Sequence, residues 1–359
     1  METIQQTSHA PRDCPPEIYH YCSVASFFGI VSSRSIWLSN SMDMNDLSEM
    51  KYLKGQVTGF VRRLGRWLSV PQNSAVYQTY AQFFDEVTPY SAQIQDQLLF
   101  LQEKLGTSIV HNILEAVIAQ IEQPVYYEDV PFIACFSSEK DLLSQWVKYA
   151  HSGTGICIGF DTGKLMQLLD QTNAAYSIGS LELPPFSLNP ICYDPAECAA
   201  YVQKEFAEFM SNITAWIEEV LKTRQISCLP AELVNGPLQA SLKAYADDFS
   251  ILVLRKAGLF KHHGFAEEAE YRLLTTDPLL FDQHLLQERT LPIECHYIND
   301  KIRTHITLDL KDLWEDGLIT SVTIGPAYKG STVDIEYFIR TRLSEKTRIY
   351  YSSIPFRLS

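Results

Sequence analysis

Two glutamates and an arginine lie close together in the run Phe265-Ala-Glu-Glu-Ala-Glu-Tyr-Arg-Leu-Leu274. We predict a strand here. Because side chains alternate along a strand, Glu268, Glu270 and Arg272 would share one face. A carboxylate pair held on a rigid strand can stabilise a developing positive charge. The alternative is a solvated strand face on which Arg272 neutralises the like charges. The opposite face would belong to the core and would carry Ala269, Tyr271 and Leu273.

Four further clusters contain residue types that bind or activate ligands. One is a predicted strand at 18–22, and another follows the predicted strand 35–39. The third ends a predicted strand at 130–137, and the fourth lies in a predicted helix at 141–150. Each has a plain structural alternative: a histidine in a core or edge strand, acidic residues at a helix start, or aromatic rings in the core. The residues concerned are His20, Tyr21 and Ser23; Asn45, Asp46 and Glu49; Ser137; and Gln145, Trp146 and Tyr149.

Several standard motifs are absent or incomplete. The run Gly159-Phe-Asp-Thr-Gly-Lys-Leu165 has one residue too few between its glycines for a phosphate loop, and Leu165 stands where a magnesium-binding hydroxyl would be. No Gly-x-Ser-x-Gly run occurs. The adjacent pair His262-His263 has no nearby cysteine or helical histidine partner, so we predict no metal site.

The elements that would position these residues are short strands near both ends of the chain, with long helical runs between them. Further strands are predicted at 156–160, 291–297, 318–326 and 347–354, and helices near 196–225 and 231–257. We predict a flexible leader at 1–16 and a single α+β domain at 17–359. Helical insertions would occupy about 51–125 and 196–257.

Composition limits the function classes. The chain has 359 residues and a formal net charge of −14, which argues against a broad basic surface that coats nucleic acid but leaves room for a local basic groove. Its eight cysteines form no Cys-x-x-Cys pair, which indicates a reducing compartment. The first residues lack the basic and apolar regions of a signal peptide, and no apolar run could span a membrane. We therefore expect a cytoplasmic protein.

Taken in order, these motifs resemble a known family. The pattern His20-Tyr21-x-Ser23, Asn45-Asp46-x-x-Glu49, Cys135-Phe136-Ser137, Leu143-Ser144-Gln145-Trp146-x-x-Tyr149, Gly155-x-x-x-Gly159-Phe160 and Glu268-x-Glu270-x-Arg272 is similar to that of the bacterial domain-of-unknown-function family 2971. Its members look like remote relatives of ADP-ribosyltransferases. The resemblance implies a small split β core that binds NAD in a cleft.

The resemblance also implies roles for individual residues. His20 matches the histidine of the first strand, and Glu268 or Glu270 matches the catalytic glutamate. Trp146 or Tyr149 would stack on the nicotinamide ring. The remaining members of the motifs would line the NAD site, Arg272 by holding the carboxylates ionised or by contacting a phosphate. Those members are Tyr21, Ser23, Asn45, Asp46, Ser137 and Gln145.

We therefore expect an ADP-ribosyltransferase that uses NAD as its substrate and needs no metal. Its acceptor would be a protein or a nucleic acid, and its setting a toxin or anti-phage system. With water as the acceptor, it would be an NAD glycohydrolase. The competing hypothesis is a nucleotide-sensing or interaction module without catalysis, whose helical insertions contact a protein partner. No membrane contact is expected.

Overall fold

The chain forms two compact units in a computed structural model that describes residues 14–41, 48–70, 90–123, 131–176, 186–229, 236, 238–275, 293–298 and 300–355. The first, here the β-unit, comprises Met1–Asn45, Val130–Ile191 and Gly264–Ser359. The second, here the helical unit, comprises Asp46–Asp129 and Cys192–His263. The helical insertions expected at about 51–125 and 196–257 fall inside the helical unit. Of the expected leader, residues 1–13 lie outside the described residues.

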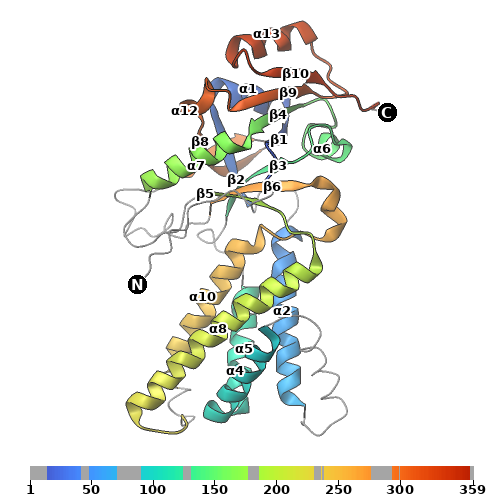
Figure 1. Ribbon diagram of the computed structural model, residues 1–359. Coiled ribbons are helices and arrows are strands. Elements are labelled where there is room, and N and C mark those ends of the chain that lie inside the picture. Colours follow the sequence, from blue (N-terminus) through green and yellow to red (C-terminus); the bar gives the residue numbers. More distant parts are fainter. Residues whose placement is uncertain are drawn as a thin grey trace. The chain divides into compact units, whose positions relative to one another are not determined.

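The β-unit contains a mixed sheet in the order β10-β9-β4-β1-β3-β2-β8-β7, with β6 beside β3 and β5 beside β6 (Figure 1). Together with the helices, this sheet confirms the α+β class. The strands are β1 (Glu17–Cys22), β2 (Ser35–Asn40), β3 (Phe132–Ser137), β4 (Ile156–Asp161), β5 (Phe186–Pro190), β6 (Glu270–Thr275), β7 (Ile293–Ile298), β8 (Lys301–Asp309), β9 (Ile319–Ile324) and β10 (Arg348–Tyr351). The helices are α1 (Val24–Ser33), α6 (Leu143–Lys148), α7 (Thr162–Tyr176), α12 (Lys311–Trp314) and α13 (Thr332–Arg342).

Strand β3 is the branch point of this sheet. Along one edge it pairs with β6 from Ile133 to Ser137. It also pairs with β1 at Ser137 and with β2 at Phe132 and Ile133. Strands β1 and β2 therefore adjoin β3 at its two ends, and the sheet is split between them.

The two faces of the sheet differ in chemistry. One face, here the apolar face, carries Ile18, Phe136, Ile158 and Leu273, which share a buried cluster with side chains of α1, α7, α12 and α13. Tyr19, Ser137 and Glu270 occupy facing positions in neighbouring strands, so they share the other face. Helix α6 contributes Trp146 to the second face, where it packs with Tyr19 and Tyr21. We call this the α6 face.

The strand predicted over residues 265–274 begins later than expected. Residues His263–Glu268 form a 3₁₀ helix, η3, and Ala269 has a left-handed backbone with φ of 44°. Strand β6 then starts at Glu270. The prediction that Glu268 lies on the strand was therefore wrong. That prediction rested on the alternation of side chains along a strand, which the η3 helix and the kink at Ala269 interrupt. Within β6, the face that carries Glu270 and Arg272 is buried.

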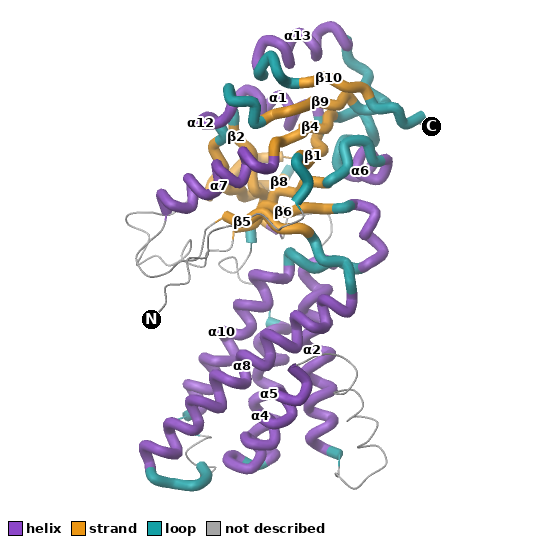
Figure 2. The backbone as a smooth tube through the Cα atoms, in the orientation of Figure 1, coloured by secondary structure: helices purple, strands orange, loops and turns teal. Residues whose placement is uncertain are grey.

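The helical unit contains α2 (Ser48–Ser69), α4 (Tyr90–Leu105), α5 (Thr107–Glu122), α8 (Pro195–Arg224) and α10 (Gln239–Ala257), which run beside one another (Figure 2). Helix α8 starts sharply because the Asp194 carboxylate accepts from the Ala196 N–H, and Pro195 stands in the first turn. Apolar residues three and four apart fill the core, among them Leu64, Val117 and Phe206. No helix in the described part of the chain has the length and apolar character needed to cross a membrane.

Candidate active site

Glu270 and Arg272 form a buried ion pair on β6. Arg272 Nε lies 2.6 Å from Glu270 Oε1, and one of its terminal nitrogens lies 3.0 Å from Oε2. The two residues are 4% and 1% exposed, so little water screens the interaction. The forked contact fixes the plane and direction of the carboxylate. This confirms that the two side chains share one strand face, as the alternation predicted.

Glu268 is bound by a different cation. Its carboxylate forms an ion pair with Lys148, the last residue of α6. The Glu268 side chain is buried, whereas that of Lys148 is 41% exposed. The Lys148 ammonium also lies 4.9 Å from the centre of the Phe265 ring. Two carboxylates separated by one residue are thus held by two separate cations, one buried and one that reaches solvent.

Ser137 and Gln145 hold the turn that carries Glu268. The Ser137 hydroxyl donates to the Glu268 carbonyl at 2.8 Å and accepts from the Glu139 N–H at 3.2 Å. Gln145 Nε2 donates to the same Glu268 carbonyl at 3.4 Å. The Ser138 N–H donates to the Ala269 carbonyl at 2.9 Å. These contacts bring Ser137, Gln145, Glu268 and Glu270 together, with the first two supporting the backbone.

The aromatic candidates of this face are packed into a small core. The Tyr21 hydroxyl donates to the Glu139 carbonyl and accepts from the Leu142 N–H, and burial raises its pKa. Trp146 is fully buried, meets Tyr21 edge to face and donates to Asp141 at 2.7 Å. Tyr149 is half-buried beside the same cluster. Of these rings, only Tyr149 retains surface for a ligand to stack on.

His20 lies on the apolar face, opposite Glu270. Its ring is 5.6 Å from that of Phe136, and its Nδ1–H donates to the Cys135 carbonyl at 2.8 Å. This hydrogen bond joins β1 to β3. Along β3 it lies between Ser137, which pairs with β1, and Ile133, which pairs with β2. Burial lowers the pKa of His20, which favours the neutral ring. His20 and the carboxylates therefore lie on different faces of the sheet. The hydrogen bond from His20 to the Cys135 carbonyl holds β1 against β3 at the split.

Ser23, Asn45, Asp46 and Glu49 are the remaining candidates. Ser23 caps α1 by accepting from the Ser26 N–H at 3.0 Å. Asn45 and Asp46 lie outside the described residues. Glu49 belongs to α2, in the helical unit, and its side chain is not described.

Lys148 is a candidate site residue that sequence reasoning missed. It lies three residues after Gln145, so both project from the same side of α6. The spacing of Gln145 and Lys148 along the predicted helix was the signal in the sequence that could have identified Lys148. An open hollow of about 400 Å³ lies beside Lys148, the residue whose ammonium pairs with Glu268. The hollow is lined by Leu142, Leu143, Ser144, Val147, Lys148 and Glu267.

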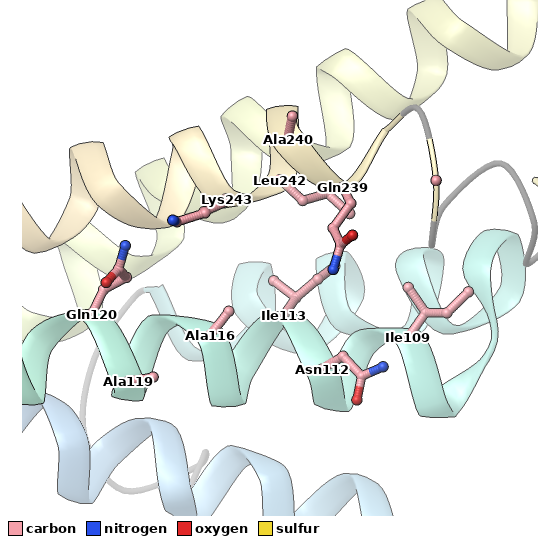
Figure 3. Close-up of a pocket in the computed structure, with 11 residues that line it drawn as sticks. Ile109, Asn112, Ile113, Ala116, Ala119, Gln120, Gln239, Ala240, Leu242 and Lys243 are labelled. Atoms are coloured by element: carbon pink, nitrogen blue, oxygen red, sulfur yellow. The ribbon is translucent and has the colours of Figure 1, made fainter.

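A second cavity, of about 510 Å³, lies in the helical unit between α5 and α10 (Figure 3). Ile109, Ile113 and Ala116 of α5 face Leu242 and Lys243 of α10. Its lining is mostly apolar and includes no carboxylate or histidine, so it offers fewer groups for acid or base chemistry than the α6 face does. Within the described residues, no three histidine, cysteine, aspartate or glutamate side chains are grouped as metal ligands.

Comparison with protein families supports the predicted family over part of the chain. Residues 145–273 match the model of a family described as protein of unknown function, DUF2971. The matched segment begins in α6 and ends in β6, so it contains Gln145, Lys148 and both glutamates. Searches of curated proteins and of solved structures found no match.

Proposed function

We propose that this protein is a cytoplasmic ADP-ribosyltransferase that cleaves the nicotinamide–ribose bond of NAD at the α6 face. The acceptor of the ADP-ribosyl group would be a protein or nucleic-acid nucleophile, in a toxin or anti-phage setting. The observation that carries this proposal is the pair Glu268 and Glu270. Both carboxylates are buried, only one residue separates them in the chain, and each is held by its own cation. The resemblance to ADP-ribosyltransferases supplies the substrate.

The chemistry of these side chains suits that bond. Nicotinamide leaves with the electron pair of the glycosidic bond, and the ribose becomes oxocarbenium-like. Arg272 fixes the Glu270 carboxylate in a dry site, where a preorganised negative charge stabilises a cationic sugar effectively. The acceptor then forms a bond to the same carbon, and Glu268 can take the proton that it loses. Lys148 must first move from Glu268, and its exposed side chain allows that movement.

The arrangement of strands also supports the proposal. The resemblance implies a split β core in which a histidine-bearing first strand and a glutamate-bearing strand build one site. Strand β1 carries His20, β6 carries Glu270, and β3 lies between them at the split. Because His20 lies on the opposite face from Glu270, it would position β1 at the split rather than contact NAD.

A non-catalytic nucleotide-binding module is the second candidate. The observation that favours it is the engagement of both carboxylates: Arg272 contacts both oxygens of Glu270, and Lys148 pairs with Glu268. A site that only binds a nucleotide needs neither carboxylate to be released. In that case the cation pairs would be permanent supports of the turn.

Nicotinamide release from NAD by the purified full-length protein distinguishes the two candidates. We expect release by the wild type and its loss, by at least 100-fold, in Glu268→Gln or Glu270→Gln. Glu345→Gln is the matched control, because Glu345 is an exposed glutamate of the same unit. Circular dichroism of each variant checks folding.

If Glu270→Gln fails to fold, nicotinamide release by the wild type still tests the proposal. No release above the buffer background, with or without cell lysate, overturns the catalytic proposal. Binding of NAD under those conditions would establish the second candidate. Release that requires lysate indicates transfer to an acceptor, whereas release without lysate indicates an NAD glycohydrolase.

A further inference from the structure

A pair of histidines on the β7–β8 hairpin lies outside the proposed active site. His305 faces Glu294 across the two strands, and His296 faces Arg303. On the other side of β8, His305 faces Ser39 and Thr307 faces Trp37 of β2. Since facing residues and residues two apart share a face, His296, His305, Glu294, Arg303 and Trp37 lie on one side of this part of the sheet.

The Nδ1 atoms of the two imidazole rings face each other. His296 Nδ1 and His305 Nδ1 are 3.0 Å apart. Two nitrogens bound to one ion at about 2.0–2.1 Å are about 2.8–3.4 Å apart for bond angles between square and tetrahedral. The observed spacing falls in that range. The ion would lie about 1.4 Å to one side of the line between the nitrogens, so both rings must turn for their lone pairs to meet at it.

Glu294 lies behind one ring. Its Oε2 lies 3.5 Å from His305 Nε2, the nitrogen that faces away from His296. At that distance the two groups are within ion-pair range, but within the described part of the chain His305 Nε2 has no hydrogen-bond partner. A hydrogen bond to Glu294 formed as the ring turns would keep the proton on Nε2 and leave the Nδ1 lone pair for the metal. Arg303 opposes a cation here, and Glu294 offsets that charge.

We propose that His296 and His305 bind a late first-row transition cation, Cu²⁺ or Zn²⁺, through their Nδ1 atoms. The hydrogen bond between the two nitrogens breaks as the ion binds, and its proton moves to His296 Nε2 or to solvent. Since no third ligand stands with them in the described residues, water or an external ligand completes the coordination. Cu²⁺ should bind more tightly than Zn²⁺ at such a nitrogen site.

Trp37 provides a direct readout of binding. Its ring centre is 3.9 Å from that of His305 and 4.8 Å from that of His296. A Cu²⁺ ion at the two nitrogens would therefore quench Trp37 fluorescence. The site is expected to bind metal whether or not the protein cleaves NAD, so the two proposals can fail separately.

The test is a titration of chelator-treated full-length protein with CuCl₂, followed by tryptophan fluorescence. We expect saturable quenching in the wild type, loss of most of it in Trp37→Phe, and binding at least 10-fold weaker in His296→Ala. Glu294→Gln, which leaves both nitrogens in place, should weaken binding about 10-fold. The matched control is His262→Ala, because His262 belongs to another histidine pair, with rings 4.1 Å apart.

Either of two results overturns the proposal. One is quenching by the wild type that does not saturate. The other is equal Cu²⁺ affinity in the wild type and His296→Ala, with the folding of each variant checked by circular dichroism. A loss in His262→Ala as large as that in His296→Ala would move the binding to the other pair and would also overturn it.

Discussion

At the scale of single residues, the buried pair Glu270–Arg272 has the largest energetic consequence. We expect Glu270→Gln to lower the free energy of unfolding by about 3–5 kcal/mol, because it leaves the Arg272 charge buried without its carboxylate. The double variant Glu270→Leu/Arg272→Met should recover most of the loss, since no charge then remains buried. Urea denaturation of the wild type and these two variants measures both effects. A single variant within 1 kcal/mol of the wild type would contradict the argument.

The backbone at Ala269 offers a second test. A left-handed conformation costs a residue with a Cβ about 1–2 kcal/mol, whereas glycine adopts it freely but has more entropy to lose on folding. These terms nearly cancel, so Ala269→Gly should change the unfolding free energy by less than about 1 kcal/mol. Ala269→Val should destabilise the protein clearly, because a β-branched residue fits poorly there. Equal stability of the glycine and valine variants would show that the kink is not retained in solution.

His20 should make stability depend on pH. Burial holds its pKa in the folded protein below the value in the unfolded chain, which is about 6.5. The unfolded chain therefore binds the proton first, so stability is full above about pH 6.5 and falls as the pH drops below it. Asp141 acts in a lower window: burial would raise its pKa, but hydrogen bonds from Ser352, Ser353 and Trp146 outweigh this and lower it.

The measurement is denaturation from pH 7.5 to 4.5. His20→Gln keeps a donor for the Cys135 carbonyl without a titrating group, so its slope over this range should be smaller than that of the wild type. His305 also has a lowered pKa, and its contribution remains in both proteins. An unchanged slope in His20→Gln would show that His20 titrates alike in the folded and unfolded states.

Alternation along the strands explains what could be predicted at this scale. Ile18, His20 and Cys22 share one face of β1 by the period of two, so the sequence already indicated that His20 belongs with apolar neighbours. What the sequence could not show was which face Glu270 would share. That depends on the register in which Tyr19 meets Ser137 and Ser137 meets Glu270, far apart in the chain.

At the scale of elements, most predicted strands are confirmed, and β8 is a strand that was missed. The predicted strands at 130–137 and 156–160 are confirmed as β3 and β4. Strand β8 was missed although Lys301–Asp309 alternates charged or polar side chains with Ile302, Ile306 and Leu308, a pattern typical of a half-buried strand. The hairpin partner of β7, and with it the pair His296–His305, was therefore absent from the sequence-based picture.

A turn after α6 is clamped against the end of β9. The Gly325 N–H donates to the Gly155 carbonyl at 3.0 Å, and a Cβ on Gly325 would lie 2.4 Å from the Gly153 carbonyl oxygen. We expect Gly325→Ala to destabilise the protein by about 2 kcal/mol or more, because two backbone segments must separate. Thermal unfolding measures the loss.

Gly29 is the matched control for that prediction. It lies inside α1, and a Cβ there would meet no atom within 4 Å. Gly29→Ala should therefore stabilise the protein by up to about 1 kcal/mol, through helix propensity alone. If both alanine variants shift the unfolding temperature in the same direction, the clamp does not account for the effect of Gly325→Ala.

At the scale of the whole molecule, each unit has its own core. The buried cluster that contains Phe160 belongs to the β-unit, and the cluster that contains Phe206 belongs to the helical unit. Because each core can support its own unit, we expect calorimetry to show two unfolding transitions. Phe160→Leu should lower one transition and Phe206→Leu the other, by about 2–4 °C for each kcal/mol lost. A single transition that both variants lower equally would mean that the units fold as one cooperative body.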